Sequence, residues 1–175
     1  MLDIRKIAAA GVVGALYAAL TIALGSFGYG PIKLRVAEAL CILPFFFPFT
    51  VWGLFVGCIA ANLISPYPLD IIVGPVATLI AALCTMKIGK TGSGSIPAKA
   101  LACLPPVVFN SIFIGALIAY YMVAEVETES FLTAFVSGAL TVGAGEIIVM
   151  YAIGLPLMIY FSKSHFFEKL SGQWR

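Results

Sequence analysis

The sequence predicts an all-α membrane protein, a bundle of six transmembrane helices. Of its 175 residues, 62% are apolar and only 10% are charged. Soluble domains carry about 25% charged residues, so apolar side chains of this chain must face lipid. Long apolar runs also recur along the chain, separated by short polar segments. The length fits a single integral membrane domain over residues 1–175.

The apolar runs set the expected spans. A helix rises about 1.5 Å per residue and the hydrocarbon core is about 30 Å thick, so one crossing needs roughly 20 residues. Pro44 and Pro48 divide one long run into two short helices, and the Gly- and Ser-rich residues 87–96 are expected to form a loop. The last run is long enough to tilt, or to kink at Gly143 and Gly145 or near Pro156. The expected spans are about 7–24, 36–47, 49–64, 69–86, 98–123 and 131–161.

The first apolar run resembles a signal peptide, because Arg5 and Lys6 precede it. It extends from Ile7 to Leu24, however, and carries no convincing cleavage site. We therefore expect it to be the first transmembrane helix.

The basic residues predict the orientation, because cytoplasmic loops of membrane proteins are enriched in Lys and Arg. Six spans place both termini on the same side. If that side is the cytoplasm, the outside holds only Lys33 and Arg35. The cytoplasmic side then holds Arg5, Lys6, Lys87, Lys90, Lys99, Lys163, Lys169 and Arg175.

Five polar residues lie within or at the edge of the apolar spans: Glu38, Asn62, Asp70, Asn110 and Glu146. A carboxylate inside a membrane is costly and by default marks a functional site. The alternative is a structural hydrogen bond or a silent, protonated carboxyl. In the six-span arrangement all five lie in the outer half of the bundle, where a ligand arriving from outside would bind.

Such a pocket suits a small, planar, polar or cationic ligand better than a lipid. A carboxylate accepts two N–H donors from a guanine-like edge, and it pairs equally well with an ammonium group. Lys33 and Arg35 lie in the loop just above the expected pocket. Aromatic residues near it are Tyr29, Phe45, Tyr67 and Phe109.

Several chemical motifs are missing from the sequence. It has no Walker A motif for ATP hydrolysis and no HExxH or GxSxG motif, so we expect no enzymatic activity and no cofactor in this chain. An intramembrane enzyme using paired carboxylates is a weaker alternative. The cysteines have no CxxC or His-paired spacing, which argues against a metal site; they are Cys41, Cys58, Cys84 and Cys103.

The first span carries two neighbouring strips of small residues at four-residue spacing. Such strips allow another helix to approach closely. They serve either packing within this bundle or docking of a separate membrane subunit. One strip consists of Gly11, Ala15, Ala19 and Ala23, and the other of Ala10, Gly14 and Ala18.

Several stretches resemble the QueT family. The segment GPIKLRVAEAL at 30–40, with Leu-Pro at 43–44, is similar to the family's first loop and second helix. The runs at 53–63, 70–79 and 104–110 are similar as well, in the same order along the chain. QueT proteins are substrate-binding S components of energy-coupling factor (ECF) transporters.

This resemblance implies six helices, both termini in the cytoplasm, and a ligand pocket below the first loop. It implies that an AxxxA-type face with Ala15 and Ala19, next to Gly11, meets a transmembrane coupling subunit. Two cytoplasmic ATPases would use the ATP. The implied substrate is a queuosine precursor, 7-aminomethyl-7-deazaguanine or its nitrile relative, and no nucleic acid is expected as a partner.

Two alternatives remain open: an S component for another vitamin-like molecule, or a standalone ion-coupled secondary transporter. No internal repeat of the kind found in many secondary transporters is present. Which carboxylate contacts which ligand group does not follow from the sequence. The expected substrate-binding residues are Glu38, Asp70 and Glu146 as carboxylates, Asn62 and Asn110 as hydrogen-bonding partners, and Arg35 as an orienting residue.

Overall fold

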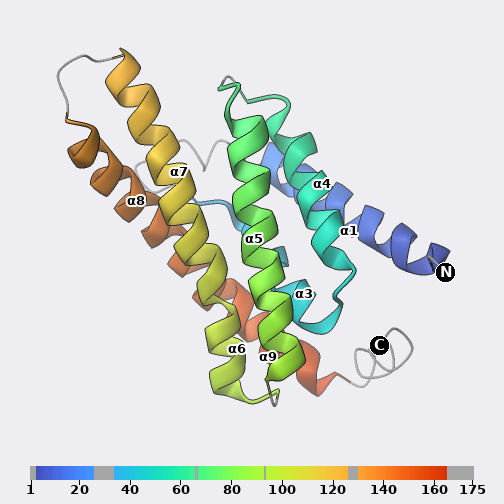
Figure 1. Ribbon diagram of the computed structural model, residues 1–175. Helices are drawn as coiled ribbons and strands as arrows, with labels where there is room; N and C mark the ends of the chain where they lie inside the picture. The colour runs from blue at the N-terminus through green and yellow to red at the C-terminus, as the bar shows by residue number, and fades with distance from the viewer. Residues whose placement is uncertain (1–2, 26–33, 66, 93, 126–129, 165–175) are drawn as a thin grey trace.

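The protein is helical throughout the residues that the computed structural model describes, which are 3–25, 34–65, 67–92, 94–125 and 130–164 (Figure 1). These ranges contain no strand, and the all-α prediction is confirmed. The elements are α1 (Ile4–Ala23), η1 (Val36–Ile42), α3 (Leu43–Phe46), α4 (Thr50–Asn62), α5 (Asp70–Thr91), α6 (Ile96–Ala102), α7 (Leu104–Glu125), α8 (Phe131–Ile147), η2 (Ile148–Gly154) and α9 (Leu155–Lys163).

Four helical stretches in the described part of the chain are long and apolar enough to cross a membrane. They are Ile4–Ala23, Asp70–Thr91, Ile96–Ala124 and Phe131–Lys163. The other two predicted spans are shorter apolar helices, Val36–Phe46 and Thr50–Asn62. Length and composition therefore support four crossings, and a bundle of six spans stays a prediction.

The predicted division of the run 36–64 is confirmed. The 3₁₀ helix η1 leads into the single turn α3, which accepts Pro44 in its first turn, where no backbone N–H is needed. The chain turns at residues 47–49, and α4 begins at Thr50. The Thr50 hydroxyl donates a hydrogen bond of 2.7 Å to the Phe47 carbonyl, which secures this turn.

The span predicted over 98–123 corresponds to the stretch Ile96–Ala124. Within it, Cys103 separates α6 from α7, because Pro105 and Pro106 occupy the first turn of α7. One predicted boundary is wrong. The predicted loop at 87–96 begins too early, since α5 continues to Thr91. Its last turns carry Lys87 and Lys90, and cations are favourable at the C-terminus of a helix.

The last run is irregular at one place. The π-helix η2 separates α8 from α9, and Pro156 lies in the first turn of α9. The irregularity therefore lies next to Pro156, which is one of the positions where the sequence predicts a kink. Gly143 and Gly145 stay within the regular helix α8.

The long helices lie side by side in the order α8, α7, α5, α4 and α1 (Figure 1). The helices α7 and α8 approach closely where Gly115 faces Ala139, since a methyl group on Gly115 would lie 2.9 Å from that residue. The buried apolar residues of the described segments form two clusters. One surrounds Tyr17, Leu54 and Cys58, and the other surrounds Ile42, Met150 and Met158.

Helix α1 lies at the edge of the bundle. Its buried residues are Gly14 and Tyr17. Gly14 faces Gly53 and Gly57 of α4 so closely that a methyl group on any of the three would overlap the backbone of the other helix. The strip that contains Gly14 thus packs inside the bundle, whereas Gly11, Ala15 and Ala19 are exposed.

Candidate ligand-binding site

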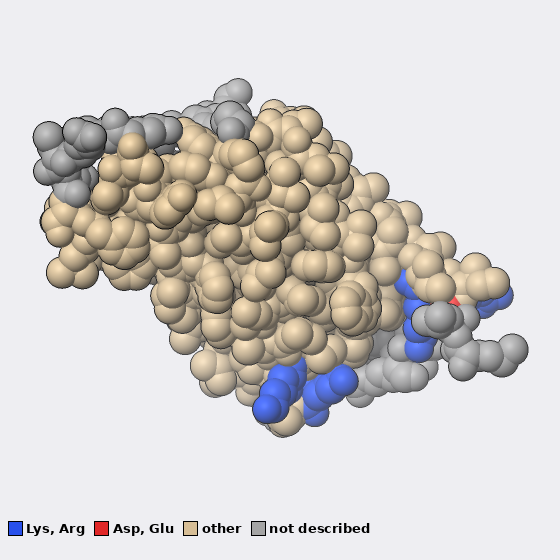
Figure 2. Space-filling view, turned by 45° about the horizontal axis from the view of Figure 1, so that its top comes forward, with Lys and Arg blue, Asp and Glu red and all other residues tan. Residues whose placement is uncertain are grey.

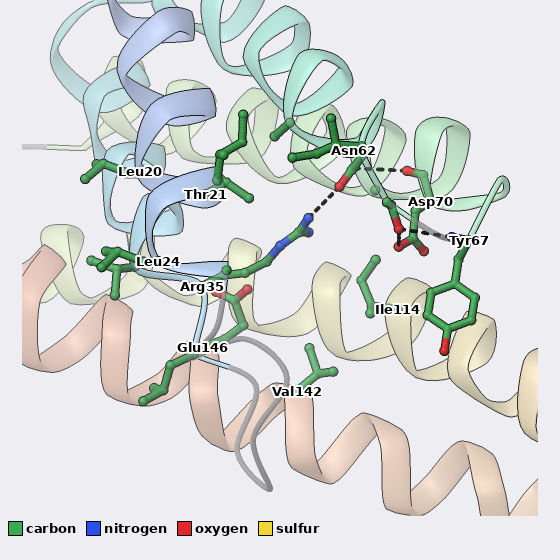
Figure 3. A pocket seen from close by; sticks show the side chains of 18 residues that line it. Leu20, Thr21, Leu24, Arg35, Asn62, Tyr67, Asp70, Ile114, Val142 and Glu146 are labelled. Atoms are coloured by element: carbon green, nitrogen blue, oxygen red, sulfur yellow. Dashed lines mark hydrogen bonds between the residues drawn. The ribbon is translucent and has the colours of Figure 1, made fainter.

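A cavity of about 530 Å³ lies where α1 and α4 end and α5 begins (Figure 3). Residues 34–36, at the start of η1, line it as well, and α7 and α8 close it on another side. Four charged or amide side chains from different parts of the chain line it: Arg35, Asn62, Asp70 and Glu146. The apolar part of its wall includes Leu20, Leu24, Leu34, Val36, Ile64, Ile114 and Val142.

Asn62 connects two walls of the cavity. Its Oδ1 accepts a hydrogen bond of 2.7 Å from Nη2 of Arg35, and its Nδ2 donates one of 3.0 Å to the Asp70 carbonyl (Figure 3). Gly74 leaves room for this amide, because a Cβ at that position would lie 2.5 Å from Asn62 Nδ2. Both ends of the amide are therefore fixed, and the Arg35 side chain is held across the cavity.

Asp70 stands at the N-terminus of α5, where the helix dipole favours a negative charge. The Ser65 hydroxyl donates a hydrogen bond of 2.7 Å to Oδ2 of Asp70. The Tyr67 N–H in turn donates to the Ser65 hydroxyl at 3.3 Å. The Asp70 side chain is half-buried, and the Tyr67 ring lies beside it at the cavity rim (Figure 3).

Glu146 reaches the cavity from α8 and is only 3% exposed. Asn110 of α7, which is 1% exposed, donates from Nδ2 to Oε1 of Glu146 at 2.8 Å. Two buried acceptor atoms, Glu146 Oε2 and Asn110 Oδ1, have no hydrogen-bond partner among the described residues. The Arg35 side chain runs beside the Glu146 carboxyl (Figure 3).

Glu38 lies behind the cavity, fully buried and outside its lining. The Tyr17 hydroxyl donates to Oε1 of Glu38, and the Cys41 thiol donates to Oε2 at 3.1 Å. The Tyr17 hydroxyl also lies 3.6 Å from Cys58 Sγ, and Asn62 Nδ2 lies 3.5 Å from the same sulfur. A buried polar network thus connects Glu38 with the cavity residue Asn62.

Comparison with known protein families matches residues 7–163 to the QueT transporter family. This chain belongs to that family. Its apolar helices are therefore those of a multi-pass membrane transport protein.

A curated relative of this QueT-family chain is the queuosine precursor transporter QueT of Lactococcus lactis subsp. cremoris (strain MG1363). The two are 38% identical over 71 residues, which cover 39% of this chain and 42% of the relative. The matched stretch thus spans less than half of that protein. No solved structure matches the chain.

Four of the six predicted substrate-binding residues of the QueT-family chain line one cavity. The other two, Glu38 and Asn110, are buried behind its wall, and a substrate-binding role for all six stays a prediction. Sequence reasoning missed Tyr17, whose hydroxyl in the middle of an apolar helix is the signal that could have identified it.

The remaining residues expected near the pocket lie at different places. Tyr67 lines the cavity, whereas Phe45 and Phe109 do not. The Phe45 backbone instead meets Gly89 of α5. Tyr29 and Lys33 lie outside the described residues. Within the described chain, no group of three or more His, Cys, Asp or Glu side chains is placed to hold a metal ion.

Proposed function

We propose that this QueT-family chain is the substrate-specificity subunit (S component) of an ECF transporter. Its substrate is a queuosine precursor, 7-aminomethyl-7-deazaguanine or a related 7-deazaguanine, which is bound for ATP-driven uptake. The observation that carries the proposal is the cavity that gathers Arg35, Asn62, Asp70 and Glu146 in an otherwise apolar bundle. Membership of the family and the name of the curated relative support the choice of substrate.

The cavity matches this ligand class in size and chemistry. Its volume of about 530 Å³ lies within the usual range for small-molecule sites, about 300–1,000 Å³. Glu146 and Asp70 offer acceptors for N–H groups of a heterocycle or for an ammonium group. Arg35 has N–H groups besides the one that Asn62 accepts, and these are available to a ligand carbonyl. Apolar side chains such as Leu24 cover the flat faces of a ring.

We place the cavity toward the outside of a six-span bundle with both termini in the cytoplasm. Asp70 begins α5 and Lys90 lies in its last turn. A helix of 22 residues is about 33 Å long, so the cavity and this lysine lie about one membrane thickness apart. The Lys and Arg side chains visible in Figure 2 gather toward one end of the molecule. An excess of basic residues on the cytoplasmic side supports this orientation.

In this proposal the chain holds no cofactor, and two partner ATPases use the ATP. A transmembrane coupling subunit contacts the exposed strip of Gly11, Ala15 and Ala19 on α1. An apolar groove of about 330 Å³ runs beside this strip, between α1 and α4. Gly11 has open space beside it, which supports close approach of a second helix.

The test is the thermal stability of the purified protein in detergent against a ligand panel. The panel contains queuosine precursors, guanine and several vitamins. A ligand at about 100 times its dissociation constant stabilises the native state by about 2.7 kcal/mol. We expect stabilisation by the 7-deazaguanines alone, and loss of the stabilisation by 7-aminomethyl-7-deazaguanine in Asp70→Ala and Glu146→Ala variants.

The alternatives predict different results. If a vitamin stabilises the protein and the deazaguanines do not, the chain is an S component for another substrate. A standalone ion-coupled transporter would take up the ligand in proteoliposomes without any ATPase, and collapse of the proton or sodium gradient would stop this uptake. The present proposal expects uptake only with the coupling subunit, both ATPases and ATP.

A further inference from the structure

We propose that the two carboxylates of the cavity bind different parts of the ligand. Glu146, held by Asn110, accepts the neutral N–H donor edge of the heterocycle, and Asp70 at the rim binds the cationic arm. This assignment rests on the proposed function and extends it to single ligand groups. Glu38, the third carboxylate, takes no part, because Tyr17 and Cys41 already donate to its two oxygens.

The surroundings of Glu146 define a site for N–H donors. Asn110 donates to Oε1, which fixes the carboxyl group and leaves Oε2 without a partner among the described residues. Asn110 Oδ1 is a second acceptor without a partner. A buried acceptor that lacks a hydrogen bond is destabilising, so native proteins satisfy nearly all of them. Glu146 lines the cavity whereas Asn110 does not, so an N–H donor of the ligand that reaches this wall satisfies Glu146 Oε2.

A cationic arm does not fit at Glu146. The Arg35 side chain runs beside this carboxyl, and its guanidinium points to Asn62 in the same cavity (Figure 3). A second cation there would be repelled by the guanidinium. Glu146 is also almost completely buried, and an ammonium group is strongly hydrated and costly to bury. Neutral N–H donors avoid both costs.

Asp70 offers what an ammonium group needs. Its side chain is half-buried at the rim, so a bound cation keeps part of its hydration. Ser65 donates to Oδ2 of Asp70, which orients the carboxylate and leaves Oδ1 for the ligand. Tyr67 lines the same end of the cavity, and its ring packs against that of Tyr121 with centroids 4.7 Å apart. Asp70 and Glu146 lie on different walls of the cavity, on α5 and α8 (Figure 3).

The test measures dissociation constants by calorimetry in detergent for three ligands that differ in single groups. The first is 7-aminomethyl-7-deazaguanine. The second is 7-cyano-7-deazaguanine, which lacks the ammonium group. The third is the first ligand without its 2-amino group. Each is measured with the wild type, Glu146→Gln and Asp70→Asn. The control is Asp3→Asn, the same kind of change at the exposed N-cap of α1, where Asn caps equally well.

We expect each variant to weaken only the ligands that carry the group its carboxylate binds. Asp70→Asn weakens both ammonium ligands about tenfold or more and leaves the nitrile unchanged, because a charged hydrogen bond is worth about 1.5–3 kcal/mol. Glu146→Gln weakens the nitrile and the aminomethyl ligand by the same factor. It has little effect on the ligand without the 2-amino group. Asp3→Asn changes none of the constants.

The opposite pattern overturns the assignment. That result is a nitrile affected by Asp70→Asn, or a loss in Glu146→Gln that depends on the ammonium group. If Glu146→Gln does not fold, the wild type alone decides, since removing the 2-amino group must weaken binding about tenfold or more. Failure of the proposed function looks different, because the wild type then binds none of the three ligands.

Discussion

The hydrogen bond between Tyr17 and Glu38 holds the edge helix α1 to the rest of the bundle, and Tyr17→Phe tests it. The change removes one hydroxyl and keeps the ring, so the packing of this buried residue is preserved. Among the described residues, Glu38 then retains only the Cys41 thiol, a weak donor. Both residues are fully buried, so water does not replace the lost donor. A hydrogen bond to a charged group is worth about 1.5–3 kcal/mol.

The expected result is a lower midpoint of thermal unfolding in detergent, by about 3–12 °C at about 2–4 °C per kcal/mol for a chain of this size. The matched control is Tyr160→Phe, because Tyr160 is 68% exposed and its change should cost no more than about 0.5 kcal/mol. In a double-mutant cycle, Tyr17→Phe and Glu38→Gln should be non-additive by about 0.5–3 kcal/mol. If Tyr17→Phe melts at the wild-type temperature, the contact contributes no stability and the reasoning is wrong.

Three further substitutions test the cavity and the contact between α1 and α4. Gly74→Ala places a Cβ against the Asn62 amide and should weaken ligand binding about tenfold by calorimetry; unchanged affinity would show that the amide moves freely. Gly57→Ala overlaps the α1 backbone and should lower the free energy of unfolding by about 1–3 kcal/mol in thermal melts, whereas Gly11→Ala, with open space, should not. Arg35→Lys keeps the charge and removes the planar fork, so we expect weaker ligand binding at unchanged melting temperature; full affinity would refute a role for the fork.

The general location of the cavity could be predicted because membrane-embedded polar groups are rare and costly. Asn62 ends one helix and Asp70 begins the next, so a short turn alone brings them to the same end of the bundle. Glu146 reaches the same cavity from a helix far along the chain. Its depth in the predicted span had placed it in the same half of the bundle.

The buried position of Glu38 could not be predicted, because it depends on a 3₁₀ helix. With three residues per turn, Cys41 lies directly above Glu38, and its thiol meets the carboxylate. An α-helix has 3.6 residues per turn, so it would place Glu38 and Cys41 at different angles around the helix axis. The helix faces predicted from the sequence therefore do not apply to this segment. The partner Tyr17 comes from α1, and a single sequence contains no signal that pairs these two residues.

The helix boundary was predicted wrongly where local composition and tertiary contacts favour different structures. Lys87, Gly89, Lys90 and Gly92 together read as a loop. In the structure Gly89 belongs to α5 because the Phe45 backbone packs against it, leaving no room for a side chain. The lysines are stable at the end of the same helix, next to its exposed carbonyl groups.

The two small-residue strips of α1 also have a consequence for its stability. The strip around Gly14 is occupied by α4, and the strip of Gly11, Ala15 and Ala19 faces outward. The helix is thus held by contacts on one side only, with Tyr17 as its buried large side chain. Elements with few buried contacts open at lower free energy than the core. Backbone amides of α1 should therefore exchange hydrogen faster than those of α5, and Tyr17→Phe should accelerate exchange in α1 much more than in α5. Equal acceleration in both helices would mean that α1 opens only with the whole bundle.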